Sequence, residues 1–130
     1  MKKKEIGSWI MSYDNNNIFA KILRGEIPCK KIYENKYALA FYDINPQAKV
    51  HILVIPKSKY ISFADFSQNA SKDEIKGFFK VVGKVAEDED LVKGGYRILA
   101  NHGVNAGQEV PHFHIHIFGK ESLGPMISKI

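Results

Sequence analysis

Hydrophobic and polar residues alternate most regularly near the end of the chain, where residues 112–118 read His-Phe-His-Ile-His-Ile-Phe. Successive side chains of an extended strand point to opposite faces, so this pattern predicts a strand with one apolar face and one imidazole-bearing face. The apolar face, which we expect to be buried, carries Phe113, Ile115 and Ile117. The other face carries His112, His114 and His116.

Four more strands are predicted from short segments that contain aromatic, β-branched or other apolar residues and are bounded by turn residues. Their ranges are 31–34, 38–42, 50–55 and 96–100. Asn35 and Lys36 form a hairpin turn between the first two strands, and Pro56 ends the third. A Gly-Gly pair at 94–95 turns the chain into the fourth. Strands that arrive as neighbouring hairpins favour an antiparallel sheet.

Two helices are predicted from caps and helical spacing. Asn17 is the candidate N-cap of a short helix that runs through Leu23 and closes at Gly25. Ser71 and Glu74 have the spacing of a capping box at the start of a long helix. The apolar face predicted for this helix comprises Ile75, Phe78, Phe79, Val82, Val85 and Ala86. The expected fold is α+β, a mainly antiparallel five-stranded sheet with one long and one short helix.

The length of 130 residues and a hydrophobic content of 45% suit a single domain with a real core. We place this domain at residues 17–130 and interpret residues 1–16, which include Trp9, as a flexible N-terminal leader. Cys29 is the only cysteine and is expected to be an inert thiol without a disulfide partner. No apolar run approaches the roughly 20 residues of a membrane span, and the start lacks the apolar core of a signal peptide. A cytoplasmic location with no membrane partner is expected.

The formal net charge of +5 does not by itself indicate a nucleic-acid partner. Apart from the lysines at 2–4, the basic residues are spread along the chain and form no stripe interleaved with aromatic residues. A solvated basic surface is the better explanation, so no nucleic-acid partner is expected.

Three alternating histidines suit two kinds of chemistry. The ordinary pKa of imidazole is about 6.5, so one ring can attack phosphorus while its neighbour protonates the leaving group. Alternating imidazoles on a strand also present ligands to zinc, and His51 would supply a fourth nitrogen. From the three histidines alone, the two interpretations have equal support.

Two neighbouring features separate these interpretations. Residues 101–107, Asn-His-Gly-Val-Asn-Ala-Gly, form either an ordinary turn or a loop whose glycines let the backbone approach a phosphate. Asp43 either caps a turn before Asn45 or accepts hydrogen bonds from the diol of a ribose. A closed zinc site would need neither feature, and no CxxC or HExxH motif accompanies the histidines. If both features contact a ligand, nucleotide chemistry is preferred over a zinc site, and His102 is given no role.

The pattern His-x-His-x-His resembles the histidine triad (HIT) family. Residues 41–57, Phe-Tyr-Asp-Ile-Asn-Pro-Gln-Ala-Lys-Val-His-Ile-Leu-Val-Ile-Pro-Lys, look like the nucleoside-binding stretch of its Hint branch, the purine nucleoside phosphoramidases. Residues 18–22, 25–28 and 107–110 also resemble that branch, so the likeness covers most of the expected domain. The resemblance implies a HIT-like fold.

This resemblance implies a metal-free and cofactor-free hydrolase that cleaves purine nucleoside 5′-phosphoramidates to a nucleoside monophosphate and an amine. It implies that His114 is the nucleophile and becomes transiently nucleotidylated. His116 would lie beside the α-phosphate and the leaving group. His112 would orient His114, and His51 would complete the proton network.

The resemblance also implies how a purine nucleotide is bound. Asp43 would bind the ribose hydroxyls, and Ile44 would line the pocket for sugar and base. The apolar wall of that pocket would consist of Phe19, Ile22 and Ile27. The residues implied around the phosphate are Asn101, Gly107, Gln108 and Glu109. A homodimer whose two sheets join is implied as well.

Two positions and the C-terminal tail depart from the Hint pattern. Glu109 stands where animal members carry serine, and a carboxylate beside the phosphate favours a cationic amine over an anionic leaving group. Pro111 replaces an aromatic residue, and the tail after Gly119 has no tryptophan. The alternatives are a Fhit-like dinucleoside polyphosphate hydrolase, which Glu109 disfavours, and a non-catalytic nucleotide-binding or zinc-binding protein.

Overall fold

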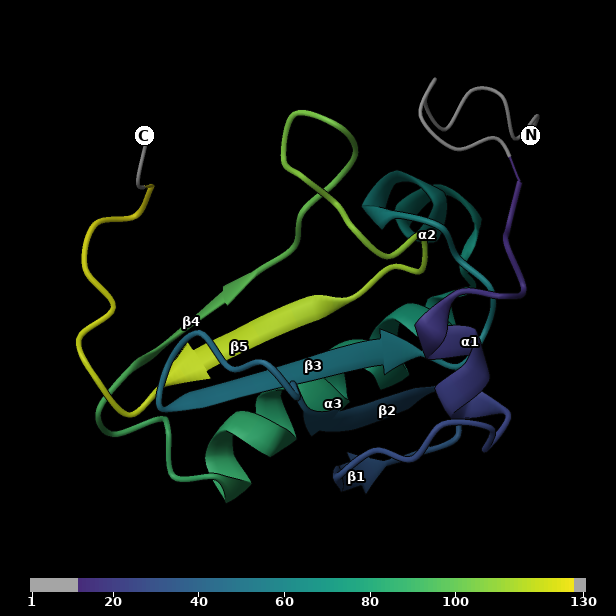
Figure 1. Ribbon diagram of the computed structural model, residues 1–130. Helices are drawn as coiled ribbons and strands as arrows, with labels where there is room; N and C mark the ends of the chain where they lie inside the picture. The colour runs from purple at the N-terminus through teal and green to yellow at the C-terminus, as the bar shows by residue number, and fades with distance from the viewer. Residues whose placement is uncertain (1–11, 128–130) are drawn as a thin grey trace.

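The computed structural model describes residues 12–127, which form one five-stranded sheet with helices around it (Figure 1). The strands lie in the order β1, β2, β3, β5, β4, and every neighbouring pair is antiparallel. Their bounds are β1 Lys31–Glu34, β2 Ala38–Tyr42, β3 Val50–Pro56, β4 Tyr96–Leu99 and β5 Ile115–Gly119. The predicted α+β class with an antiparallel five-stranded sheet is confirmed. Trp9 and the lysines at 2–4 lie outside the described residues.

Side-chain caps set the starts of the helices, whose bounds are α1 Ile18–Leu23, α2 Phe63–Asn69 and α3 Lys72–Asp88. Asn17 caps α1 as predicted, because its Oδ1 accepts the N–H of Ala20 at 2.9 Å. Ser71 and Glu74 form the predicted capping box of α3. The short helix α2 is an addition to the two predicted helices. Between residues 12 and 127, no helix is long and apolar enough to cross a membrane.

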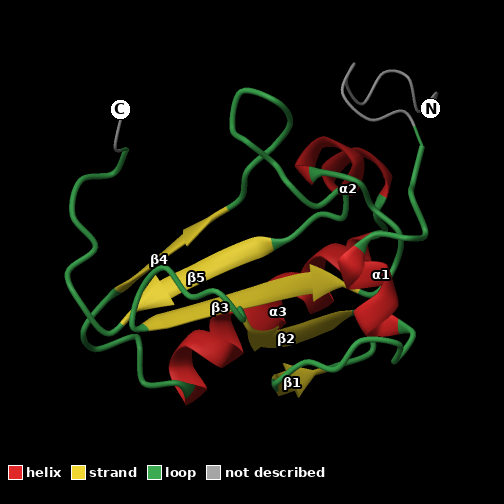
Figure 2. Ribbon diagram, in the orientation of Figure 1, coloured by secondary structure: helices red, strands yellow, loops and turns green. Residues whose placement is uncertain are grey.

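Helix α3 covers one face of the sheet and lies behind it in Figures 1 and 2. The sheet residues of this face come from alternate positions of three strands and are Ala38, Ala40, Ile52, Val54, Ile115 and Ile117. They pack against Phe78, Val81, Val82, Val85 and Ala86 of α3. The prediction that Phe79 is buried here was wrong, because it lies at the margin of the apolar stripe and is 41% exposed.

The opposite face of the sheet carries a smaller apolar cluster and the histidines. The cluster brings α1 onto the sheet beside the end of β3 and consists of Phe19, Leu39, Phe41, Leu53 and Ile55. The strand register places Leu53 of β3 opposite His116 of β5. Because side chains alternate along a strand, His51 lies on the same face as Leu53 and His116. The predicted division into an apolar and a histidine face is therefore present.

Strand β5 begins at Ile115, three residues later than the predicted strand. Its pairing with β3 stops at the pair of Val54 and Ile115. Before that point, the N–H of Phe113 donates to the carbonyl of Tyr60 at 2.7 Å and not to a neighbouring strand. His114 thus precedes the strand ladder, although Phe113 still enters the α3 core.

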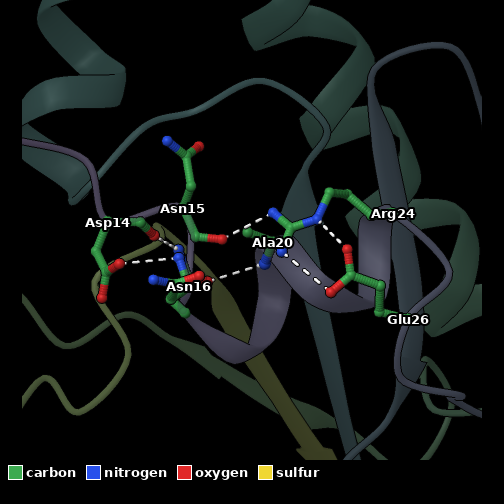
Figure 3. Close-up of polar contacts among 7 residues, drawn as sticks. Asp14, Asn15, Asn16, Ala20, Arg24 and Glu26 are labelled. Carbon is green, nitrogen blue, oxygen red and sulfur yellow. Dashed lines mark hydrogen bonds and ion pairs between the residues drawn. The ribbon is translucent and has the colours of Figure 1, made fainter.

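The residues just before α1 are hydrogen-bonded to the domain, as Figure 3 shows for Asn15 and Arg24. Arg24 donates to the carbonyl of Asn15 at 2.7 Å. The carbonyl of Asp14 accepts the side-chain amide of Asn17 at 2.7 Å and its backbone N–H at 3.2 Å. These bonds hold the last residues of the predicted leader and place Tyr13 beside the histidines.

Candidate active site

His114 is buried, with 7% of its surface exposed, and one ring nitrogen is bonded to the backbone. Its Nδ1 lies 2.7 Å from the carbonyl oxygen of His112. A carbonyl only accepts, so Nδ1 carries the proton and the lone pair of the neutral ring is on Nε2. Burial lowers the pKa of His114 below its ordinary value, although the hydrogen bond to His112 opposes this effect. At pH 7 the ring is neutral, as a nucleophile must be.

His116 is hydrogen-bonded to His51, and the backbone determines which ring donates. The N–H of Gln47 donates to Nδ1 of His51 at 3.2 Å, so the proton of neutral His51 is on Nε2. This Nε2 lies 2.9 Å from Nδ1 of His116, which accepts. The remaining proton of neutral His116 is therefore on its Nε2. Burial and the neighbouring histidines lower the pKa of His116 to about 4, and burial also lowers the pKa of His51 against the attraction of Asp43.

His112 is completely buried and does not line the pockets described below. Its Nε2–H donates to the carbonyl of Pro56 at 2.9 Å, and its Nδ1 lies 2.6 Å from the hydroxyl of Tyr13. Burial lowers the pKa of His112 to about 4. The contact from His112 to His114 runs through the backbone carbonyl, so any orienting effect of His112 is exerted there.

His114 and His116 border a polar pocket of about 220 Å³. Among its lining residues are these predicted site residues: Phe19, Asp43, Asn101, Gly107, Gln108, Glu109, His114 and His116. An apolar pocket of about 280 Å³ includes the predicted residues Phe19, Ile22, Ile27, Asp43, Ile44 and Glu109. Because both pockets are lined by Phe19, Asp43 and Glu109, one ligand with an apolar and a polar end can occupy both. The predicted residues His51 and His112 line neither pocket.

Asp43 lies where the two pockets meet, and its carboxylate has two contacts. Its Oδ1 accepts the N–H of Asn45 at 2.8 Å, which is the turn-capping contact considered from the sequence. Its Oδ2 lies 3.5 Å from Nε2 of His51. A carboxylate has about four acceptor positions, so the turn cap leaves acceptors for a ligand hydroxyl.

The loop of residues 101–108, which precedes the histidines, is held by hydrogen bonds within the loop. Gly103 and Gly107 both have positive φ, +73° and +70°, which favours glycine. The N–H of Gly107 donates to Val104 and that of Gln108 donates to Gly103, each at 3.0 Å. The side chain of Gln108 also bonds within the protein, to the N–H of Gly103 and to the carbonyls of Ile61 and Val110. Gln108 therefore braces the loop, and the predicted phosphate contacts of Gly107 and Gln108 stay predictions.

Some residues of the pockets were missed by sequence reasoning. Asn45 and Gln47 line the polar pocket, and their position in a polar turn after Asp43 was the available signal. Cys29 lines the apolar pocket and is half-buried, and burial raises the pKa of its thiol. No periodic pattern pointed to Cys29, which lies in a loop between α1 and β1.

One group within residues 12–127 brings three metal-ligating side chains together, with ligand atoms of Asp43, His51 and His116 within 4.8 Å of one another. The nitrogens of His51 and His116 are hydrogen-bonded at 2.9 Å. Two nitrogens bound to one tetrahedral zinc would lie roughly 3.3 Å apart with no proton between them. Both ring nitrogens of His112 are also engaged by Tyr13 and Pro56. The arrangement fits a hydrogen-bonded histidine network better than a zinc site.

Comparison with known proteins agrees with this architecture. The family model described as HIT domain matches residues 24–123. An uncharacterized HIT-like protein from Azospirillum brasilense is 59% identical over 91% of this chain and 97% of its own length. The purine nucleoside phosphoramidase of Escherichia coli K12 is 41% identical over 85% of this chain and 92% of its own length. A solved histidine triad protein from Clostridium difficile superposes with a TM-score of 0.80 at 38% identity, covering 89% of this chain and 100% of that one.

The antiparallel sheet, with alternating histidines on the face opposite its long helix, has the architecture of a histidine triad protein. The family match covers most of the chain, and the relatives are aligned over nearly their whole length. The chain belongs to the HIT family of hydrolases.

Proposed function

We propose that the protein hydrolyses purine nucleoside 5′-phosphoramidates through a nucleotidyl-His114 intermediate. The observation that carries this proposal is the 2.7 Å hydrogen bond from Nδ1–H of His114 to the backbone, which leaves the Nε2 lone pair for attack. His114 and Asp43 border the same polar pocket. The phosphoramidase name of the Escherichia coli relative supports the choice of substrate class.

In the first step, the Nε2 lone pair of His114 attacks the α-phosphorus. A bond forms between phosphorus and Nε2, and the bond between phosphorus and the amine nitrogen breaks. An amine nitrogen that has already taken up a proton from solvent leaves as a neutral amine. Glu109 borders the pocket and is exposed, so its carboxylate attracts the protonated form of that nitrogen.

In the second step, water attacks phosphorus and the bond to Nε2 of His114 breaks. The products are a nucleoside monophosphate and one proton that passes to solvent, and His114 returns to its starting state. The Nε2–H of neutral His116 is oriented by His51 and is available to donate to a phosphoryl oxygen.

The nucleoside would occupy the junction and the apolar pocket. Asp43 would accept hydrogen bonds from the ribose hydroxyls, and the base would lie against Phe19, Ile22 and Ile27. Ile44 is 79% exposed at the edge of this pocket, so a bound sugar would cover apolar surface that is otherwise in water.

Release of AMP from adenosine 5′-phosphoramidate in the presence of EDTA tests the proposal. The unaltered protein is compared with His114→Ala, and diadenosine polyphosphates are tested in parallel. We expect AMP from the phosphoramidate with the unaltered protein alone. Faster cleavage of the diadenosine polyphosphates would replace the proposal with a dinucleotide hydrolase, and activity abolished by EDTA would return metal chemistry to consideration.

We also infer a homodimer that joins through β4. Both β1 and β4 are sheet edges, but β1 carries the ion pair of Lys31 and Glu34, at 2.9 Å, which discourages pairing with another strand. In contrast, β4 exposes Tyr96 and Ile98, by 41% and 46%. Light scattering should give twice the mass of the chain, and Ile98→Lys should give a monomer. A monomeric unaltered protein would contradict this inference.

A further inference from the structure

Tyr13 connects the segment before α1 to the innermost histidine of the row. Its hydroxyl lies 2.6 Å from Nδ1 of His112, a residue 99 positions later in the chain. The two rings meet edge to face, with centroids 5.6 Å apart and an interplanar angle of 69°. Tyr13 lines neither the polar nor the apolar pocket, so it acts on a ligand there only through other residues.

The direction of this hydrogen bond follows from the other nitrogen of His112. Nε2 must donate, because its partner is the carbonyl of Pro56. In a neutral ring Nδ1 is then an acceptor, so the hydroxyl of Tyr13 is the donor. The ring of His112 is fully buried and has no solvent to replace a lost partner. Tyr13 and Pro56 therefore hold the ring from both sides in one tautomer.

The main chain of His112 connects the fixed His112 ring to the ring of His114. The carbonyl of His112 accepts Nδ1–H of His114 at 2.7 Å, so the position of residue 112 sets the direction of the His114 ring. The rings of Phe19 and His114 also meet, with centroids 4.9 Å apart. Small displacements of a reacting group are costly, since attack requires alignment with the phosphorus.

We propose that Tyr13 is a positioning residue, which holds His112 so that the His112 carbonyl aims Nε2 of His114 into the polar pocket. This inference rests on the proposed function for its kinetic consequence. The structural coupling of Tyr13 to His114 is independent of substrate. It also assigns a task to part of the segment before α1, which the sequence indicated only as a leader.

The test compares Tyr13→Phe with Tyr60→Phe. Each change removes one tyrosine hydroxyl that makes a hydrogen bond, and the hydroxyl of Tyr60 donates to Glu74 at 2.8 Å, in the capping box of α3. With adenosine 5′-phosphoramidate, Tyr13→Phe should lower kcat roughly tenfold and change KM less than about twofold. The reason is that this change disturbs the orientation of the His114 ring and leaves the lining of the pocket intact. Tyr60→Phe should leave both constants unchanged.

A second readout needs no substrate. In the nitrogen-15 spectrum of the imidazole rings, Tyr13→Phe should shift the Nδ1 resonances of both His112 and His114, and Tyr60→Phe should shift neither. If Tyr13→Phe fails to fold, 3-fluorotyrosine at position 13 keeps the ring and strengthens the donor. This substitution should move the same two resonances in the direction expected for a stronger hydrogen bond.

The two readouts separate failure of this inference from failure of the proposed function. If the unaltered protein cleaves no phosphoramidate, the proposed function fails, and the His114 resonance alone decides the coupling. A His114 resonance that is the same in Tyr13→Phe and the unaltered protein overturns the inference. Equal kcat values for Tyr13→Phe and Tyr60→Phe would also overturn the inference.

Discussion

The two faces of the sheet bury different kinds of surface. The face under α3 buries hydrocarbon, with Phe66, Phe78 and Phe113 packed within 5.3 Å of one another by ring centroids. The opposite face buries the rings of His51, His112 and His114. Across residues 12–127, every fully buried side-chain nitrogen and oxygen has a hydrogen-bond partner.

Neighbouring residues of one strand are therefore under different physical constraints. A change on the α3 face alters volume and packing, so it should change stability first. A change on the histidine face alters hydrogen-bond partners and protonation, so it should change activity first. The two kinds of residue alternate along the segment before and within β5.

The largest expected effect separates His114 from its neighbour Phe113. His114→Ala removes the nucleophile and should lower phosphoramidate hydrolysis at least about a thousandfold. Phe113→Leu leaves the histidines in place and should cost about 1–2 kcal/mol of unfolding free energy through lost packing. Steady-state kinetics and urea unfolding of both variants measure this difference. Comparable loss of activity in the two variants would contradict the division between faces.

The histidine face should also lose stability in acid. Burial lowers the pKa of His112 to about 4, from about 6.5 in the unfolded chain. Between these two pKa values the unfolded ring binds a proton and the folded ring does not. The contribution of the neutral ring to stability is therefore complete above about pH 6.5 and is lost as the pH falls toward 4. For His112 the full loss is about 3 kcal/mol. Glu34, whose pKa is lowered from 4.5 to about 2 by hydrogen bonds from Lys57 and Lys31, loses its contribution only as the pH falls below about 4.5. Urea unfolding at roughly pH 7.0, 5.5 and 4.5, which covers most of the range between the unfolded and folded pKa values of His112, measures the loss. Constant stability over this range would contradict the prediction.

On the α3 face, Gly77 should be sensitive to any added side chain. A Cβ at Gly77 would collide with the ring of Tyr37, which packs against the helix there. Gly77→Ala should therefore destabilise the protein by about 1–3 kcal/mol and leave kcat unchanged. Thermal unfolding and kinetics on the same sample check both parts. An unchanged unfolding temperature would show that Tyr37 moves aside at little cost.

The smallest expected effect has the opposite sign and comes from the same helix. Gly83 is exposed, and a Cβ there would have no neighbour within 4 Å. Gly83→Ala should stabilise the protein by up to about 1 kcal/mol, because alanine is the better helix former. Unfolding of Gly83→Ala beside Gly77→Ala tests this contrast. Destabilisation by both would mean that packing does not distinguish the two positions.

Local signals were sufficient for much of the fold. The bounds of β1 and β2 follow from short segments with strand-forming residues on either side of a turn, and the capping box of α3 follows from Ser71 and Glu74. Helix α2 was missed, although Ser62 and Asp65 have the spacing of an N-cap and an acidic third residue, and Ser62 does cap the helix. Its seven residues span only about two helical turns, too few for an apolar periodicity to stand out. The late start of β5 depends on a hydrogen bond to Tyr60 that joins distant parts of the chain.

The residue types of the site were predictable, but their partners were not. Alternation and the family resemblance identified the histidines and Asp43, which the structure brings to one site. Neither could show that His112 contacts His114 through a carbonyl. The contact of Tyr13 joins positions 99 residues apart and leaves no periodic signal. The side-chain bonds of Gln108 within the loop likewise depend on tertiary structure.

Strict alternation before and within β5 also limits which insertions and deletions this chain can accept. One residue added between Pro111 and Ile115 would turn the residues on one side of it to the other face, so an imidazole would enter the α3 core and a hydrocarbon side chain would face the pocket. A single in-frame codon there would damage packing and chemistry together. Changes in length at this site are therefore expected to be far rarer among viable sequences than changes at the exposed loop tip around Val104.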